Sequence, residues 1–127
     1  MTDLPITSDL TALAILGLIL LSVPVSLRRR KLSISRGDGG DETLGRRIRA
    51  QGNYIEYVPI ALIAFGLAEA GGSTAPTLCW IAAAFIAGRV LHVWGMWAGI
   101  LPPRAIGMLI TWLSLLAIGG ALVCNYY

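Results

Sequence analysis

The chain has few charged side chains, one histidine and two cysteines. Charged residues make up 13% of its 127 residues, against roughly 25% in ordinary soluble domains. One histidine and two remote cysteines do not form a zinc-ligand set, so we expect no metal. Neither Cys79 nor Cys124 has a histidine or other base beside it, which argues against a catalytic thiol. We interpret both as small buried apolar residues, and a disulfide between them stays open.

Apolar sequence dominates what remains, at 56% of the residues. A membrane-spanning helix needs about 20 mostly apolar residues. Apolar sequence continues on both sides of Glu56 and Arg89, so we place each of them inside a helix. The sequence predicts an all-α membrane protein, one domain over residues 1–127 with four transmembrane helices in an up-down bundle. The predicted spans are about 9–27, 44–68, 76–98 and 103–124.

Local signals predict where the helices begin. Ser8 or Asp9 is expected to cap the first helix, and Asp41 or Thr43 the second, because their side-chain oxygens accept from unpaired backbone N–H groups. Pro76 suits the first turn of the third helix. Four glycines within the spans are expected to allow close helix approach: Gly17, Gly66, Gly119 and Gly120.

The basic residues predict the orientation in the membrane. Eight of the ten Lys and Arg residues lie between Arg28 and Arg49, bracketed by apolar runs. Such a local stripe is typical of a cytoplasmic loop rather than of a nucleic-acid-binding surface. We therefore expect loop 28–49 inside, both termini outside, and the protein in a bacterial inner membrane.

Three residues that can carry charge lie well inside the predicted spans and need partners, because a charged group at a helix centre costs roughly 2.5–3.5 kcal/mol on insertion scales. They are Glu56, Arg89 and His92. Arg49 and Asn53 share one face of the second helix with Glu56, by their spacing. The second and third helices run antiparallel, which places Glu56 and Arg89 at similar depth and predicts an ion pair between them.

That pair has two interpretations. Either it only holds the two helices together, or it belongs to a polar pocket open to the cytoplasm. The pocket also explains why further polar residues lie near the cytoplasmic ends of the helices, which the ion pair alone does not explain. Guanidinium groups, an amide and one carboxylate suit a small, mainly anionic ligand with at least one cationic group.

Two motifs resemble a known family. "RAQGNYIEYVP" at 49–59 is similar to the signature of the MAPEG superfamily, the membrane-associated proteins of eicosanoid and glutathione metabolism. "GRVLHVWGMW", followed by "LPPR" at 101–104, resembles the third-helix signature of that family and the loop after it. The chain resembles a bacterial-type member related to microsomal glutathione transferase and prostaglandin E synthase.

The resemblance implies a homotrimer that binds glutathione between subunits near the cytosolic side. It implies a transferase or peroxidase acting on lipophilic electrophiles that arrive from the bilayer. Arg104 matches the arginine that stabilises the glutathione thiolate, and Arg89 joins it as a catalytic candidate. The matching glutathione contacts are Arg29, Arg49, Gln51, Asn53, Glu56, Tyr57 and His92.

Other functions stay open at this point. Some family members place tyrosines where this chain has His92 and Met96, which affects the contacts and the reaction. One alternative is a protein that binds glutathione or lipid without chemistry. Another is a small four-helix transporter in which Glu56 carries the proton.

Overall fold

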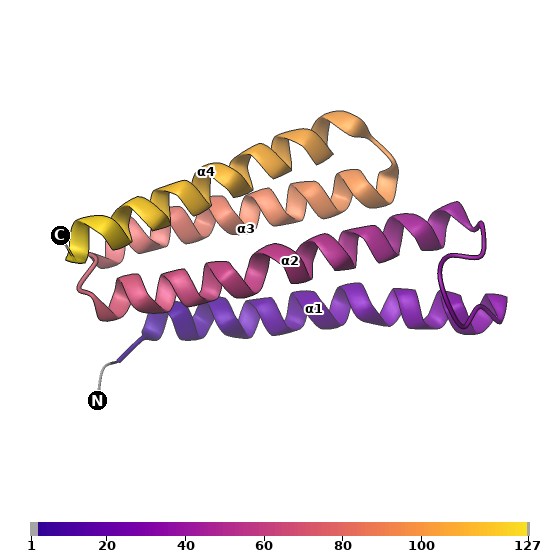
Figure 1. The fold of residues 1–127 in the computed structure, drawn as a ribbon, viewed down its shortest axis with the longest axis horizontal. Coiled ribbons are helices and arrows are strands. Elements are labelled where there is room, and N and C mark those ends of the chain that lie inside the picture. The colour runs from indigo at the N-terminus through magenta and orange to yellow at the C-terminus, as the bar shows by residue number, and fades with distance from the viewer. Residues whose placement is uncertain (1–2, 127) are drawn as a thin grey trace.

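A computed structural model describes residues 3–126 and contains four antiparallel helices over that range (Figure 1). They are α1 (Pro5–Leu32), α2 (Glu42–Ala70), α3 (Ala75–Ala98) and α4 (Leu101–Tyr126). Both termini lie at one end of the bundle, and the 33–41 connection lies at the other (Figure 1). At that second end, α1 and α2 extend beyond α3 and α4. The all-α fold is as predicted, with each helix longer than its predicted span.

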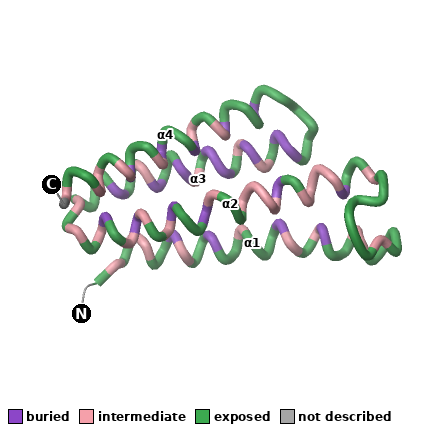
Figure 2. Tube along the Cα trace, viewed as in Figure 1, coloured by how far each residue is buried: buried purple, intermediate pink, exposed green. Residues whose placement is uncertain are grey.

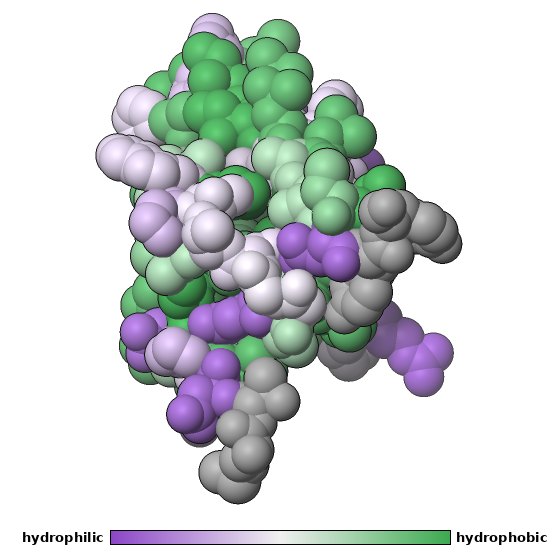
Figure 3. Space-filling view, turned by 90° about the vertical axis from the view of Figure 1, so that its left-hand side faces the viewer, coloured by the Kyte–Doolittle hydropathy of each residue, from purple (hydrophilic) through white to green (hydrophobic). Residues whose placement is uncertain are grey.

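Three of the described helices, α1, α3 and α4, are long and apolar enough to cross a membrane. Helix α2 is equally long and lies alongside α1 (Figure 1), but charged residues in its first half lower its mean hydropathy. The buried positions of all four helices face one another, and the outer faces are exposed (Figure 2). Large apolar side chains make up much of that exposed surface, as expected where lipid replaces water. Figure 3 looks onto the end that carries the termini, where hydrophilic side chains lie beside apolar ones.

The start of α1 differs from the prediction that Ser8 or Asp9 caps it. The helix begins at Pro5, and its N-cap residue makes no side-chain hydrogen bond. Instead the Glu69 carboxylate, from the last turn of α2, accepts hydrogen bonds from the N–H groups of Ile6 at 2.9 Å and Thr7 at 2.8 Å. The cap is supplied by another helix, so local sequence signals did not reveal it.

The start of α2 matches the prediction. Asp41 is its N-cap and accepts a hydrogen bond from the Leu44 N–H at 2.7 Å. Arg28, near the end of α1, forms an ion pair with the same carboxylate at 2.7 Å. The hydrogen bond from Arg28, aided by the one from Leu44, holds the pKa of Asp41 below its ordinary value. Pro76 lies in the first turn of α3, also as predicted.

The α3–α4 contact depends on two glycines that were not predicted to allow close helix approach. A Cβ at Gly107 would overlap the His92 backbone nitrogen, and one at Gly95 would overlap the Arg104 nitrogen. The prediction for Gly119 and Gly120 was wrong, since neither has any atom within 4 Å of a built Cβ. The prediction for Gly17 is confirmed, because the Tyr54 ring occupies the space beside it.

We expect Gly107→Ala to destabilise the fold by about 1–3 kcal/mol, the usual cost of overpacking, because backbone rather than a flexible side chain blocks the new methyl group. Gly119→Ala, on the same helix but in open space, is the matched control. We expect it to be neutral or slightly stabilising, since alanine is the better helix former. Denaturant titration in mixed micelles measures both, and equal effects would contradict the proposed close approach.

The two cysteines also differ from expectation. Cys79 and Cys124 are free thiols, and both are exposed rather than buried. They lie on outward faces of α3 and α4 near the end with the termini. A small, weakly polar side chain is compatible with such a lipid-facing position, which explains why the prediction of burial failed.

Candidate functional site

Arg89 is the centre of a polar cluster inside the bundle. It lies on α3 and is only 4% exposed. Its Nη2 donates to Asn53 Oδ1 on α2 at 2.5 Å, and its Nη1 donates to Thr111 Oγ1 on α4 at 3.4 Å. Thr111 in turn donates to the Gly107 carbonyl at 2.8 Å. Arg89 thus joins three helices through neutral hydrogen-bond partners.

The predicted Glu56–Arg89 ion pair is absent from the described residues. The two recorded ion pairs are Arg28–Asp41 and Arg46–Glu42, and Glu56 is exposed. The depth argument was sound, because Asn53 lies one turn before Glu56 and does reach Arg89. The predicted rotation of α2 about its own axis was wrong. Asn53 faces α3, whereas Glu56 faces outward.

Tyr57 forms the outer side of this cluster. The Arg89 guanidinium carbon lies 5.6 Å from the centroid of the Tyr57 ring, within the range of a cation–π contact. The Tyr57 hydroxyl accepts a hydrogen bond from the Trp112 indole N–H at 3.2 Å. Two contacts from different helices therefore hold the tyrosine ring in place.

His92 connects the cluster with the start of α4. It is 3% exposed, and its Nδ1 lies 3.1 Å from the Arg104 carbonyl oxygen. This contact fixes the backbone of Arg104 and leaves its guanidinium available. Arg89, His92 and Met96 share the buried face of α3.

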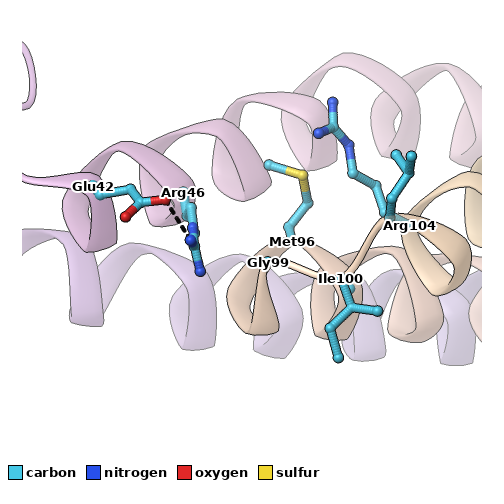
Figure 4. A pocket seen from close by; sticks show the side chains of 8 residues that line it. Glu42, Arg46, Met96, Gly99, Ile100 and Arg104 are labelled. Atoms are coloured by element: carbon cyan, nitrogen blue, oxygen red, sulfur yellow. Dashed lines mark hydrogen bonds and ion pairs between the residues drawn. The ribbon is translucent and has the colours of Figure 1, made fainter.

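A cavity of about 240 Å³ opens at the end of the bundle with the 33–41 connection. Arg46 of α2 and Arg104 of α4 lie on either side of Met96 in Figure 4. Arg46 also pairs with Glu42 and lies against Gly99, whose φ of 70° suits glycine. The lining residues are Glu42, Arg46, Gly95, Met96, Gly99, Ile100, Leu101 and Arg104.

Not every predicted site residue joins this region. Gln51 turns toward α1 and donates to Ser22 at 2.7 Å. Arg29 is half-buried near the end of α1, and its Nη1 has no partner among the described residues. Arg49 and Glu56 are exposed on the outward face of α2. A single chain therefore gathers Asn53, Tyr57, Arg89, His92 and Arg104, and leaves the other four apart.

Three residues of the site were not predicted from the sequence. Thr111 is fully buried beside Arg89, and its signal was a hydroxyl within an apolar run. Trp112 contacts Tyr57 but resembles an ordinary lipid-facing aromatic residue in the sequence. Arg46 shares the face of Arg49 and Asn53 by spacing, yet only the structure places it in the cavity wall.

The electrostatic balance of this region is positive. Arg89 has no carboxylate partner among the described residues, and its buried Nε has no hydrogen-bond partner there. Arg104 adds a second cation at the cavity. A buried guanidinium without an anion is costly, so the arrangement is suited to an anionic ligand, which guanidinium groups bind through charge-assisted hydrogen bonds.

Comparison with protein families matches residues 10–124 to the MAPEG family. Inner membrane protein YecN of Escherichia coli strain K12 is 33% identical over 106 residues, which cover 81% of each chain. The protein of the same name from Escherichia coli O6:H1, strain CFT073, matches to the same extent. No solved structure matches the chain. With nearly its whole length matched to the family, the chain belongs to the MAPEG family.

Proposed function

We propose that the protein is a glutathione-dependent membrane transferase or peroxidase that acts on lipophilic electrophiles. The observation that carries the proposal is positive charge at two depths: Arg104 lies in the cavity wall, and Arg89, six residues before the lining residue Gly95 on α3 or about 9 Å at the helical rise, has no carboxylate partner among the described residues. Glutathione has two carboxylates, one ammonium group and one thiol, and its anionic groups suit such a site. Family membership supports the same ligand. The relatives are inner membrane proteins, which supports a bacterial inner membrane location. The concentration of Lys and Arg in the 28–49 loop favours the cytoplasmic side for that loop.

The site is completed by a second copy of the chain in this proposal. The cavity of about 240 Å³ is smaller than the roughly 300–1,000 Å³ typical of ligand pockets. Glu56 is exposed at the middle of α2, where lipid contact would be costly. Arg49 is exposed on the same face. A homotrimer covers both residues and places them at glutathione bound between subunits.

The chemistry follows from the arginines. A thiol of pKa near 8.5 is mostly protonated at neutral pH, and a nearby guanidinium favours the thiolate. Arg104 supplies that charge from the start of α4, and its backbone is held by His92. The thiolate sulfur attacks the electrophilic carbon, and the leaving group departs with its bonding electron pair. Asn53, Glu56 and Arg49 position the peptide portion.

The test is binding of glutathione to the detergent-purified protein, followed by absorbance in the thiolate band at neutral pH. We expect a saturable rise with glutathione and none with S-methyl glutathione, which binds in the same way but has no ionisable thiol. Binding without a rise would leave a protein that holds glutathione without activating it. Absence of binding by both ligands would overturn the proposal.

A further inference from the structure

The Tyr57 hydroxyl has one unused donor. An indole N–H only donates, so in the 3.2 Å contact with Trp112 the tyrosine oxygen is the acceptor. Its own hydrogen has no recorded acceptor among the described side chains and backbone groups. The ring is held by Trp112 at its hydroxyl and by Arg89 at its face. The phenol is therefore a fixed donor that no protein group in the described part of the chain uses.

This donor lies near mid-height of the bundle and toward its outer surface, which corresponds to the bilayer interior if the bundle spans the membrane. Tyr57 follows Glu56, the middle residue of α2, which places it about 20 Å from either end of the helix at 1.5 Å per residue. It is half-buried, and Trp112 is 49% exposed. A free O–H at that depth has no water to bind. Its acceptor must be another buried group or a molecule dissolved in the bilayer.

The depth also separates Tyr57 from the thiol end of the site. Trp112 lies eight residues after Arg104 along α4, or about 12 Å at the helical rise. A ligand held by Arg104 at the cavity therefore has Tyr57 on its bilayer side. This is the direction from which a lipophilic co-substrate approaches.

We infer that the Tyr57 hydroxyl, oriented by Trp112, donates a hydrogen bond to an oxygen atom of the lipophilic co-substrate. This inference rests on the proposed function and narrows its substrate class to lipophilic electrophiles that carry an acceptor oxygen remote from the carbon that the glutathione sulfur attacks. The hydrogen bond orients the co-substrate, so Tyr57 positions it and takes no part in bond formation. Trp112 is a positioning residue, since it acts through Tyr57.

The experiment needs no turnover and no glutathione. Wild-type protein in nanodiscs is loaded with 2-tridecanone carrying ¹³C at its carbonyl, and the carbonyl stretch is recorded by infrared spectroscopy. We expect a band at lower frequency than in empty nanodiscs, because hydrogen bonding weakens the C=O bond. Tyr57→Phe is expected to remove that band. Trp112→Phe is expected to broaden it, and Trp112→His, which retains a ring N–H, to restore it in part.

Affinity gives an independent readout. Losing one neutral hydrogen bond corresponds to about a three- to tenfold weaker binding of the ketone. The matched 2-chlorotridecane, which has no oxygen, should bind Tyr57→Phe and the wild type equally. Equal losses for both ligands would reduce Tyr57 to a packing residue and overturn the inference. So would an unshifted band in the wild type, or a shifted band that persists in Tyr57→Phe.

The two proposals fail separately. Absence of glutathione binding overturns the proposed enzyme but leaves the ketone band unaffected. Absence of the ketone band removes the assigned role of Tyr57 and leaves thiolate formation at Arg104 intact.

Discussion

Replacing Arg104 with alanine is expected to raise the pKa of the bound glutathione thiol by about one to three, the effect of losing an opposite charge a few ångströms away. The thiolate fraction at neutral pH then falls by up to tenfold for a rise of one and by up to about a thousandfold for a rise of three. The rate falls with it and recovers as pH rises, because the thiol still ionises once the pH exceeds its new pKa. The measurement is a pH titration of thiolate absorbance on protein saturated with glutathione, with the rate followed in parallel.

Arg36→Ala is the matched control for this prediction. Arg36 lies exposed in the loop between α1 and α2, away from the cavity lining. Its loss removes the same charge from the chain without removing it from the site. Coincident titration curves for the wild type and Arg104→Ala would exclude Arg104 from the mechanism and make Arg89 the next candidate.

Replacing Asn53 with leucine is expected to destabilise the fold by about 2–3 kcal/mol. The change removes the closest acceptor of a buried guanidinium and leaves a charged donor unsatisfied. Thr111 is the remaining side-chain oxygen within reach, at the longer distance of 3.4 Å. Denaturant titration of the assembled protein in mixed micelles gives the free energy of unfolding.

Glu56→Gln is the control that distinguishes the observed partner of Arg89 from the one expected at first. Glu56 does not contact Arg89, so the substitution leaves the guanidinium with its Asn53 and Thr111 partners and is expected to cost less stability than Asn53→Leu. If Glu56→Gln is the more damaging change, then Glu56 has a buried partner that a single chain does not contain.

Much of the fold followed from the sequence because its signals are local. Apolar runs, Asp41 before α2 and Pro76 at the start of α3 act within one or two turns of helix. The glycine predictions depended instead on contacts between helices, which have no local signal, and they were partly wrong. Gly119 and Gly107 are both glycines within an apolar helix, and only their rotation toward a neighbouring helix distinguishes them.

The site was predictable in depth and composition but not in its contacts. The sequence placed Glu56 and Arg89 at similar depth, and the contact of Arg89 with Asn53, one turn before Glu56, supports that depth. A choice between Asn53 and Glu56 as partner requires the rotation of α2 to better than one residue. Tertiary packing of Tyr54 against Gly17 and of Val58 in the core sets that rotation. Such contacts between distant segments leave no local pattern.

The bond between Glu69 and the start of α1 bears on how the protein enters the bilayer. In the predicted orientation, the N–H groups of Ile6 and Thr7 gain this carboxylate only after the far end of α2 has crossed the membrane. Helix α2 alone is also the least apolar of the four and does not qualify as a span by its own hydropathy. We therefore expect α1 and α2 to insert together as one helical hairpin, in which the strongly apolar first helix carries its polar neighbour across the membrane.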